Sequence, residues 1–262
     1  MPNHGETAKL SVMAEDLVIN EIYVSLQGES TFAGLPCVFV RLTACNLRCS
    51  YCDTAYAFTE GKKRDLAGVL SEVNRLAAAF VDAPTPKSHN GVQRLPLVEL
   101  TGGEPLLQKS CLPLMTALCD AGFSVLLETS GAHDIEAVDP RVHRIMDLKC
   151  PSSGEMARNR LENIPALKSS DEIKFVIGTR EDYDWAKGMI AQYRLAAICP
   201  ILFSWVQPLR PKQQHKSLKP VPAGQTPLSR QELAEAVIRD ALPVRFQVQM
   251  HKIIWSPDQR GV

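Results

Sequence analysis

Segments typical of β-strands alternate with segments typical of α-helices along most of this 262-residue chain. The strand-like segments are short and rich in branched apolar residues, and they cover residues 17–28, 37–44, 97–100, 123–128, 143–148, 172–178, 200–206 and 244–250. The helix-like segments cover residues 64–80, 106–122, 180–193 and 229–242, the last with a capping-box start at Ser229 and Glu232. This alternation predicts an α/β fold with a largely parallel sheet, either open and doubly wound or arranged as a barrel.

Polar or glycine-bearing clusters follow strand after strand, which helps to choose between these two architectures. They begin at Gly102, Thr129, Lys149, Gln207 and His251. A barrel enzyme builds its site from the carboxyl ends of many strands, whereas an open sheet uses mainly the crevice where the strand order reverses. The clusters therefore favour a barrel or partial barrel, and the small number of helix-like segments argues against a complete eight-fold barrel.

The chain reads as one domain with a short tail. Residues 1–16 are predicted to be loosely held, and residues 17–262 are predicted to form a single partial-barrel domain, because no repeat or linker divides them. Residues 81–96 form a polar, proline-bearing loop, and residues 209–227 form a second proline-rich loop.

Composition excludes several classes of function. The formal net charge is zero, so no overall field favours nucleic acid or an anionic membrane. No apolar run is long enough to span a membrane, and the first twenty residues do not resemble a secretory signal. We therefore expect a cytoplasmic protein, in which the eight cysteines are thiols or metal ligands rather than disulfides.

Three cysteines lie close together in the segment TACNLRCSYCDT, at Cys45, Cys49 and Cys52. The other five lack a partner at short spacing. Four of them lie in apolar segments and are expected to be small buried side chains, and Cys150 is ambiguous; the four are Cys37, Cys111, Cys119 and Cys199. The cluster of three therefore stands apart.

Three thiolates select zinc, copper(I) or an iron–sulfur cluster rather than a hard cation. One possibility is structural zinc, held by these cysteines and a distant histidine or cysteine. The other is a [4Fe–4S] cluster, which normally takes one cysteine per iron, so that three cysteines leave one iron open. An open position is typical of a catalytic site.

The spacing Cys45-x-x-x-Cys49-x-x-Cys52, with Tyr51 before the last cysteine, resembles the signature of radical S-adenosylmethionine enzymes. Thr101-Gly102-Gly103-Glu104-Pro105 resembles their GGEP segment. The resemblance implies that S-adenosylmethionine chelates the open iron. It also implies a cofactor site formed by Gly103, the backbone around Tyr51, Cys52 and Asp53, Lys149, and the Gln207-Pro208 turn.

From about Asn20 onward the chain is similar to 7-carboxy-7-deazaguanine synthases. The similar segments are Glu21 to Ser30, Arg41, Cys52-Asp53-Thr54, Glu128 to Gly131, Asp147-Leu148-Lys149 and Gln249 to Lys252. This resemblance implies a shortened (β/α)6-type barrel, TIM-like, and a homodimer. The implied activity converts 6-carboxy-5,6,7,8-tetrahydropterin to 7-carboxy-7-deazaguanine with loss of ammonia, on the route to queuosine and other deazapurines.

The same resemblance assigns a magnesium site and a substrate site. It implies that Thr54 contacts a Mg²⁺ that also touches the substrate carboxylate; the alternative is that the Thr54 hydroxyl caps a turn. The implied pterin-contacting positions are Leu26, Gln27, Gly28, Glu29, Arg41, Thr101 and His251. For His251, a structural hydrogen bond is the alternative. No catalytic acid or base is identified, and no role is assigned beyond Lys252.

The cluster must be reduced from outside, so the resemblance also implies a one-electron donor such as flavodoxin or ferredoxin. Two other functions remain open from the sequence. A radical-activating enzyme for a glycyl-radical partner shares the three-cysteine motif but leaves the segment from Gln27 to Glu29 unexplained. A zinc-stabilised binding module would use the cysteines without catalysis.

Overall fold

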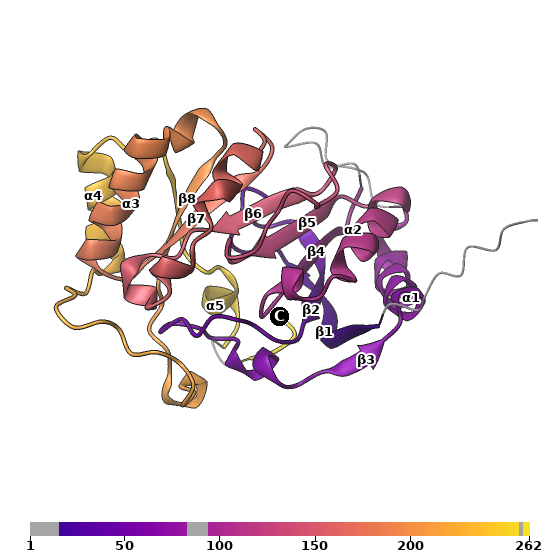
Figure 1. The fold of residues 1–262 in the computed structure, drawn as a ribbon. Coiled ribbons are helices and arrows are strands. Elements are labelled where there is room, and N and C mark those ends of the chain that lie inside the picture. The colour runs from indigo at the N-terminus through magenta and orange to yellow at the C-terminus, as the bar shows by residue number, and fades with distance from the viewer. Residues whose placement is uncertain (1–15, 83–93, 257–258) are drawn as a thin grey trace, which may run out of the picture.

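A computed structural model of the chain describes residues 16–82, 94–256 and 259–262, and it shows a curved sheet with helices packed on its outer side (Figure 1). The strands are β1 (Leu17–Leu26), β2 (Pro36–Leu42), β3 (Lys62–Arg64), β4 (Leu97–Gly102), β5 (Val125–Thr129), β6 (His143–Asp147), β7 (Glu172–Ile177), β8 (Ile201–Trp205) and β9 (Arg245–Gln247). The α-helices are α1 (Leu66–Ala77), α2 (Cys111–Asp120), α3 (Arg180–Tyr193), α4 (Arg230–Arg239) and α5 (His251–Ile254).

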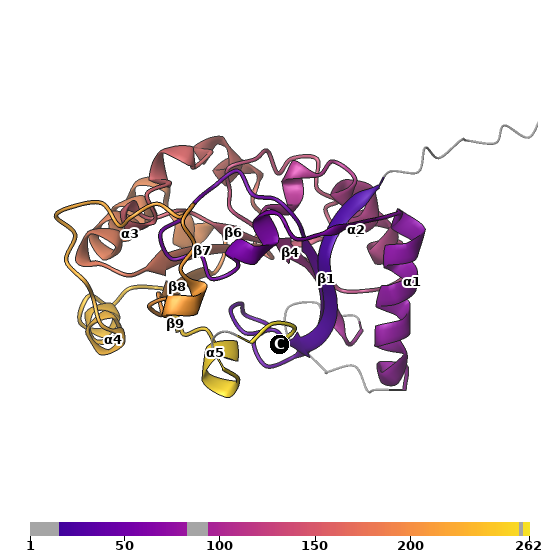
Figure 2. The same ribbon diagram turned by 90° about the horizontal axis from the view of Figure 1, so that it is seen from below.

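The nine strands form one sheet in the order β3-β1-β2-β4-β5-β6-β7-β8-β9. Each neighbouring pair from β2 to β9 is parallel, while β1 pairs antiparallel with both β2 and β3. Helices α1 to α4 lie between successive parallel strands in the chain and form an arc around the outer face of the sheet (Figure 2). The predicted α/β fold with a largely parallel, barrel-like sheet is confirmed, and the sheet is unclosed.

Alternation along the strands separates an apolar outer face from a polar inner face. In β4, for example, Val98 and Leu100 belong to the core beneath the helices, whereas Glu99 and Thr101 line the central cavity. At the amino ends of the parallel strands the inner face is filled by a small apolar cluster that includes Cys37, Leu97, Leu126, Ile145 and Phe32. This packing leaves the carboxyl ends of the strands as the polar end of the barrel.

The segment that follows β1 lies between the two ends of the sheet. Gln247 donates its side-chain amide to Ser30 O at 2.9 Å, and Gln249 donates its amide to Glu29 Oε1 at 3.0 Å. The amide N–H of Met250 also points to Gly28 O, at 3.4 Å. Residues 28–30 and 247–250 therefore meet across the open side of the sheet.

The predicted helix over residues 106–122 is too long. Its first part is the 3₁₀ helix η3 (Pro105–Leu107), and α2 begins only at Cys111. Gln108 between them is extended because its side-chain amide bonds the backbone of Val18 and Thr43. The predicted end at Gly122 is confirmed, since Gly122 has a φ of +81°, which favours glycine.

Two further differences lie near the chain ends. The predicted strand over 244–250 ends at Gln247, because Gln249 and Met250 bond the segment after β1 instead; His251 therefore begins α5 and does not end a strand. Strand β3 was not predicted, because its three residues are all cationic and exposed. It exists through pairing with β1 at the edge of the sheet, where lysine and arginine discourage association with other strands.

Other predictions have mixed outcomes. The capping box at Ser229 and Glu232 is confirmed, with Ser229 N–H 2.8 Å from the glutamate and the reciprocal bond at 3.2 Å. All eight cysteines are free, and Cys119 is only partly buried. Residues 1–15 of the predicted tail (residues 1–16) and most of the predicted loop over 81–96 lie outside the described residues. Among the described residues, no helix is long and apolar enough to cross a membrane.

Candidate active site

A polar cavity of about 520 Å³ lies at the carboxyl ends of the parallel strands. Its volume is typical of a site for small organic molecules. Every residue predicted from the sequence to hold a cluster, cofactor, metal or substrate lines it, except Pro208. These residues are Leu26, Gln27, Gly28, Glu29, Arg41, Cys45, Cys49, Tyr51, Cys52, Asp53, Thr54, Thr101, Gly103, Lys149, Gln207 and His251.

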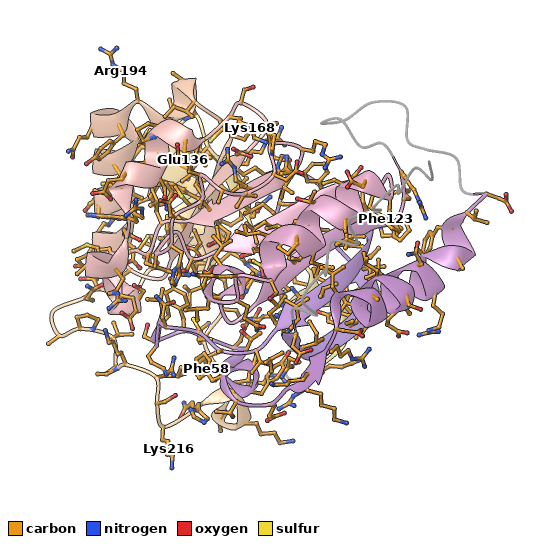
Figure 3. All side chains as sticks on the ribbon, turned by 45° about the vertical axis from the view of Figure 1, so that its right-hand side comes forward. Phe58, Phe123, Glu136, Lys168, Arg194 and Lys216 are labelled. Carbon is orange, nitrogen blue, oxygen red and sulfur yellow. The ribbon has the colours of Figure 1, made fainter. Side chains whose placement is uncertain are left out.

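The three cysteines project into this cavity from the loop that follows β2, which we call the cysteine loop (residues 43–54). Its backbone is held locally. Leu47 N–H points to Cys45 Sγ at 3.4 Å, and the guanidinium of Arg48 donates to the carbonyl oxygens of Cys45 and Leu47. The Arg48 side chain packs over the Phe58 ring, 4.2 Å from its centroid. Figure 3 shows Phe58 on the same side of the molecule as Lys216 and opposite Arg194.

Burial raises the pKa of the Cys49 thiol to about 12, and it also raises the pKa values of Cys45 and Cys52. Binding of iron must therefore displace protons from these thiols. In the described part of the chain, no three histidine, cysteine or acidic side chains converge closely enough to hold a single metal ion. The three thiols nevertheless line one cavity, as an iron–sulfur cluster bound by all three requires.

Gly102 at the end of β4 and Gly103 after it allow the cysteine loop to approach the strand end. A Cβ atom on Gly103 would lie 2.1 Å from Ala44 O and 3.0 Å from Cys45 Cβ, and one on Gly102 would lie 2.3 Å from Leu42 O. Gly102 also has a φ of +150°. The pair therefore permits close contact between two parts of the chain, in addition to any contact with a ligand.

Thr54 is the N-cap residue directly before the 3₁₀ helix η1 (Ala55–Phe58), but its side chain makes no capping hydrogen bond there. Its hydroxyl lies 3.7 Å from Cys52 Sγ, at the wall of the cavity. This position does not support the turn-capping role and leaves the hydroxyl directed toward the cluster side of the site.

A chain of charged and amide groups crosses the cavity from the cysteine loop to the opposite wall. Asp53 Oδ2 lies 2.5 Å from Lys252 Nζ, which also donates to Gln249 Oε1, and Gln249 in turn donates to Glu29. Glu29 completes the chain at Lys174, whose Nζ is 3.5 Å from Oε2. Burial opposes the charge on Glu29, but Lys174 and His251 lower its pKa overall.

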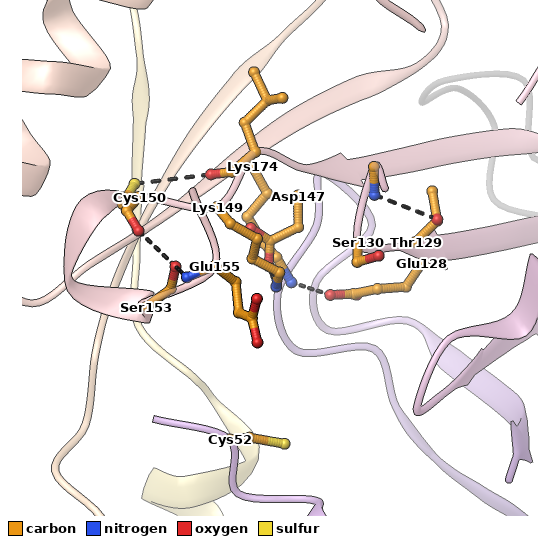
Figure 4. A network of polar contacts seen from close by, with 12 residues as sticks. Cys52, Glu128, Thr129, Ser130, Asp147, Lys149, Cys150, Ser153, Glu155 and Lys174 are labelled. Atoms are coloured by element: carbon orange, nitrogen blue, oxygen red, sulfur yellow. Dashed lines mark hydrogen bonds and ion pairs between the residues drawn. The ribbon is translucent and has the colours of Figure 1, made fainter. Parts of the chain in front are cut away.

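Lys174 lies on β7 at the centre of the inner face, with a side chain that is 3% exposed, and it also pairs with Glu128 of β5 (Figure 4). Glu99 of β4 lines the same wall, and burial together with the charge of Glu128 raises the pKa of Glu99 to about 8. These three residues were not predicted as site residues. An alternation of polar and apolar residues within each strand is the signal that could have identified them.

The Gln27 side chain forms hydrogen bonds with neighbouring residues of the protein. Its Oε1 accepts the backbone N–H groups of Glu29 and Ser30, at 2.9 and 3.0 Å, and its Nε2 donates to Glu99 Oε2 at 3.1 Å. The side chain thus shapes the segment after β1 and keeps one amide hydrogen for a ligand.

Arg41 is held in place by two partners on β1. Its Nε lies 2.8 Å from Glu21 Oε1, and its Nη2 donates to the Tyr23 hydroxyl at 2.8 Å. Tyr56 donates to the same oxygen of Glu21, and Arg260 stacks over the Tyr56 ring at 3.9 Å. The guanidinium lines the cavity in a fixed orientation, which suits recognition of a carboxylate.

The remaining predicted residues lie around the same opening. Lys149 pairs with Asp147 at 2.7 Å, and Asp147 Oδ1 and the Tyr51 hydroxyl are buried without a hydrogen-bond partner among the described residues. Such atoms at the cavity wall can bind a polar ligand. The His251 ring lies 3.8 Å from Glu29 Oε1 and remains 30% exposed.

Comparisons with known proteins agree in one name. The chain is 42% identical over 246 residues to "7-carboxy-7-deazaguanine synthase" of Koribacter versatilis, covering 93% of this chain and 99% of that protein. It is 45% identical over 249 residues to the protein of the same name from Chlorobaculum tepidum, covering 94% and 97%. No protein-family model matches the chain.

Among solved structures, QueE from Escherichia coli has a TM-score of 0.62 at 20% identity, covering 89% of this chain and 94% of that one. At that identity the likeness shows the shared fold.

Proposed function

This chain belongs to the family of 7-carboxy-7-deazaguanine synthases, and we propose that the polar cavity described above holds an iron–sulfur cluster, S-adenosylmethionine, Mg²⁺ and a carboxylated pterin together. It is a radical S-adenosylmethionine enzyme of deazapurine biosynthesis, and its reaction is that of a carbon–nitrogen lyase. The single observation that carries the proposal is the convergence of sixteen of the seventeen predicted residues on that cavity.

Cys45, Cys49 and Cys52 would hold the [4Fe–4S] cluster, with S-adenosylmethionine on its open iron. When bound, this pair would supply the radical chemistry that removes a hydrogen atom from the substrate. The chain's own contribution is positioning. Lys149 and Asp147 would face the cofactor with one cation and one buried acceptor atom, while Gly103 lets the cysteine loop pack closely against β4.

The pterin would lie over the carboxyl ends of β2, β4, β5 and β7, on the inner face of the sheet. Arg41, fixed by Glu21 and Tyr23, would bind the substrate carboxylate as a charge-assisted pair. A 2-amino-4-oxopyrimidine edge offers both donors and acceptors. Glu29 is an ionised acceptor, and the spare amide hydrogen of Gln27 is a donor, so the two suit opposite positions on such an edge.

Mg²⁺ keeps most of its water ligands and needs few from protein, so the Thr54 hydroxyl is sufficient as a protein ligand. The position of this hydroxyl at the cavity wall, 3.7 Å from Cys52 Sγ, supports the assignment. We also propose a cytoplasmic homodimer that accepts electrons from a small carrier such as flavodoxin or ferredoxin. Light scattering of the purified protein and comparison of carrier proteins as reductants would test these two points.

The Arg41→Ala variant tests the substrate assignment. Loss of the charge partner of a buried carboxylate costs about 2–5 kcal/mol, so the pterin concentration needed for half-maximal rate should rise at least ~30-fold. The requirement for S-adenosylmethionine should change little. Lys187→Met is the matched control, because Lys187 pairs with Asp240 on the outer helices and does not line the cavity. An equal rise in both requirements would show that Arg41 supports the site as a whole and does not bind the pterin.

A further inference from the structure

A short turn after β6 holds the cysteine loop from outside the cavity. We call residues 150–155 the clamp turn; it includes the 3₁₀ helix η4 (Pro151–Ser153). Ser50, which lies between the second and third cysteines, donates its backbone N–H to Ser153 O at 3.1 Å and its hydroxyl to Ser152 O at 2.7 Å. The clamp turn therefore fixes the shorter segment between two cysteines, from Cys49 to Cys52.

The longer segment, from Cys45 to Cys49, is fixed by Glu155 at the end of the clamp turn. Its carboxylate accepts the backbone N–H of Arg48 at 2.7 Å and is only 5% exposed. Lys219 Nζ lies 2.9 Å from the other carboxylate oxygen, and the backbone N–H of Lys219 donates to Arg48 O at 2.9 Å. Figure 4 shows the Glu155 side chain extending from the turn toward the loop that carries Cys52. Glu155 does not line the cavity.

The clamp turn is itself anchored to the core. The carboxylate of Asp182, at the start of α3, is fully buried and accepts the backbone N–H and the hydroxyl of Ser152, at 2.7 and 2.6 Å. It also accepts the backbone N–H groups of Gly178 and Thr179. With four donors on one carboxylate, the turn is a rigid support and not a flexible cover.

The peptide that Glu155 holds is adjacent to a hydrogen bond that reaches a cysteine sulfur. Arg48 N–H is bound by Glu155, and the preceding N–H, of Leu47, points to Cys45 Sγ at 3.4 Å. Hydrogen bonds to the sulfurs are among the factors that set the reduction potential of an iron–sulfur cluster. Reduction adds negative charge, so a donor at the sulfur favours the reduced form.

We propose that Glu155 is a positioning residue, which holds Leu47 N–H toward the Cys45 sulfur and thereby raises the reduction potential of the cluster. The inference rests on the proposed function, because it needs a cluster on these cysteines. It adds a residue outside the cavity that acts on the electron-accepting step and does not touch cofactor or substrate.

The test compares Glu155→Leu with Glu155→Gln. Both variants lack the charge and have similar size, but only glutamine keeps an oxygen that can accept Arg48 N–H. The protein is loaded with iron and sulfide without oxygen, and the midpoint potential of the cluster is measured by redox titration followed by electron paramagnetic resonance. We expect the midpoint potential to be more negative in the leucine variant than in the glutamine variant. At any one solution potential, a smaller fraction of the clusters should then be reduced in the leucine variant.

A second comparison keeps the charge. Glu155→Asp retains the carboxylate but shortens the side chain, so we expect its midpoint potential to lie below that of the unchanged protein; this variant also serves if the leucine variant does not fold. Glu172→Gln against Glu172→Leu is the matched control, because Glu172 is another buried glutamate that accepts a backbone N–H, that of Thr31, and does not line the cavity. That pair should show equal potentials.

Equal potentials for Glu155→Leu and Glu155→Gln, with both clusters intact, would overturn the inference and leave the proposed function standing. If the leucine variant does not assemble a cluster, the Glu155→Asp variant decides, and a midpoint potential equal to that of the unchanged protein would overturn the inference. Failure of the unchanged protein to bind any cluster is a different outcome, which would overturn the proposed function and this inference with it.

Discussion

Replacement of Glu99 by glutamine should make the protein more stable at alkaline pH while having little effect at acid pH. Glu99 is 2% exposed, and burial and the nearby Glu128 raise its pKa from 4.5 to about 8. In the folded protein it is therefore a neutral acid at pH 7. Glutamine is neutral at every pH and keeps an oxygen for the amide of Gln27, which lies 3.1 Å away.

The sign follows from proton linkage. Between pH 4.5 and about 8 the folded state holds a proton on Glu99 that the unfolded state has lost, so the free energy of unfolding falls as pH rises through this range. At about 1.4 kcal/mol per pH unit, the loss in the wild-type protein has an upper limit of about 5 kcal/mol. The measured value should be smaller, because Glu128 shares the proton binding.

Urea unfolding of metal-free protein, followed by tryptophan fluorescence from about pH 5 to about pH 9, measures this difference. The stability of Glu99→Gln relative to wild type should increase with pH and become constant above about pH 8. Glu232→Gln is the control, since its hydrogen bonds with Ser229 lower the pKa of Glu232 and keep it ionised in both states across this range. A Glu99→Gln difference that does not vary with pH would mean that Glu99 is ionised in the folded protein.

Further predictions concern the cluster, the magnesium ion and the core. Cys49→Ala should abolish the iron–sulfur absorbance and all cleavage of S-adenosylmethionine, whereas Cys111→Ala, in the apolar core, should keep both and lose some thermal stability. Thr54→Ala should weaken activation by Mg²⁺ without loss of iron, while Thr54→Ser should retain most activity; unchanged magnesium dependence in the alanine variant would refute the ligand role. Asp171→Asn leaves Arg144 buried without its charge partner and should cost about 3–5 kcal/mol in urea unfolding, with normal iron content; a loss under about 1 kcal/mol would contradict this.

The order of strands and helices could be predicted because periodicity and caps are local. Helix α3 has the predicted bounds, and α4 starts at its predicted capping box. The errors came from long-range contacts. Gln108 ends the helical region before α2 because it bonds β1, and β9 is short because Gln249 bonds Glu29, a residue 220 positions away in the sequence. A single sequence gives no sign of such pairs.

The site shows the same division. The residues that line the cavity could be predicted, because family-like motifs fall at strand ends. What could not be predicted is how those residues engage one another. Gln27 uses most of its hydrogen-bonding groups to shape its own segment, and Arg41 is shared with Glu21 and Tyr23. Lys174, the cation at the centre, was missed because composition alone does not distinguish it, and the alternation of polar and apolar residues along β7, which could have identified it, was not used.

The central claim is that this cavity turns a carboxylated tetrahydropterin into a deazaguanine. The most direct test supplies reduced, cluster-loaded protein with S-adenosylmethionine, Mg²⁺ and 6-carboxy-5,6,7,8-tetrahydropterin in the absence of oxygen, and follows the products by mass spectrometry. We predict 7-carboxy-7-deazaguanine together with ammonia, with S-adenosylmethionine regenerated and not consumed. An intact cluster that cleaves S-adenosylmethionine but never converts this pterin would contradict the claim and would favour an activating enzyme for a glycyl-radical partner.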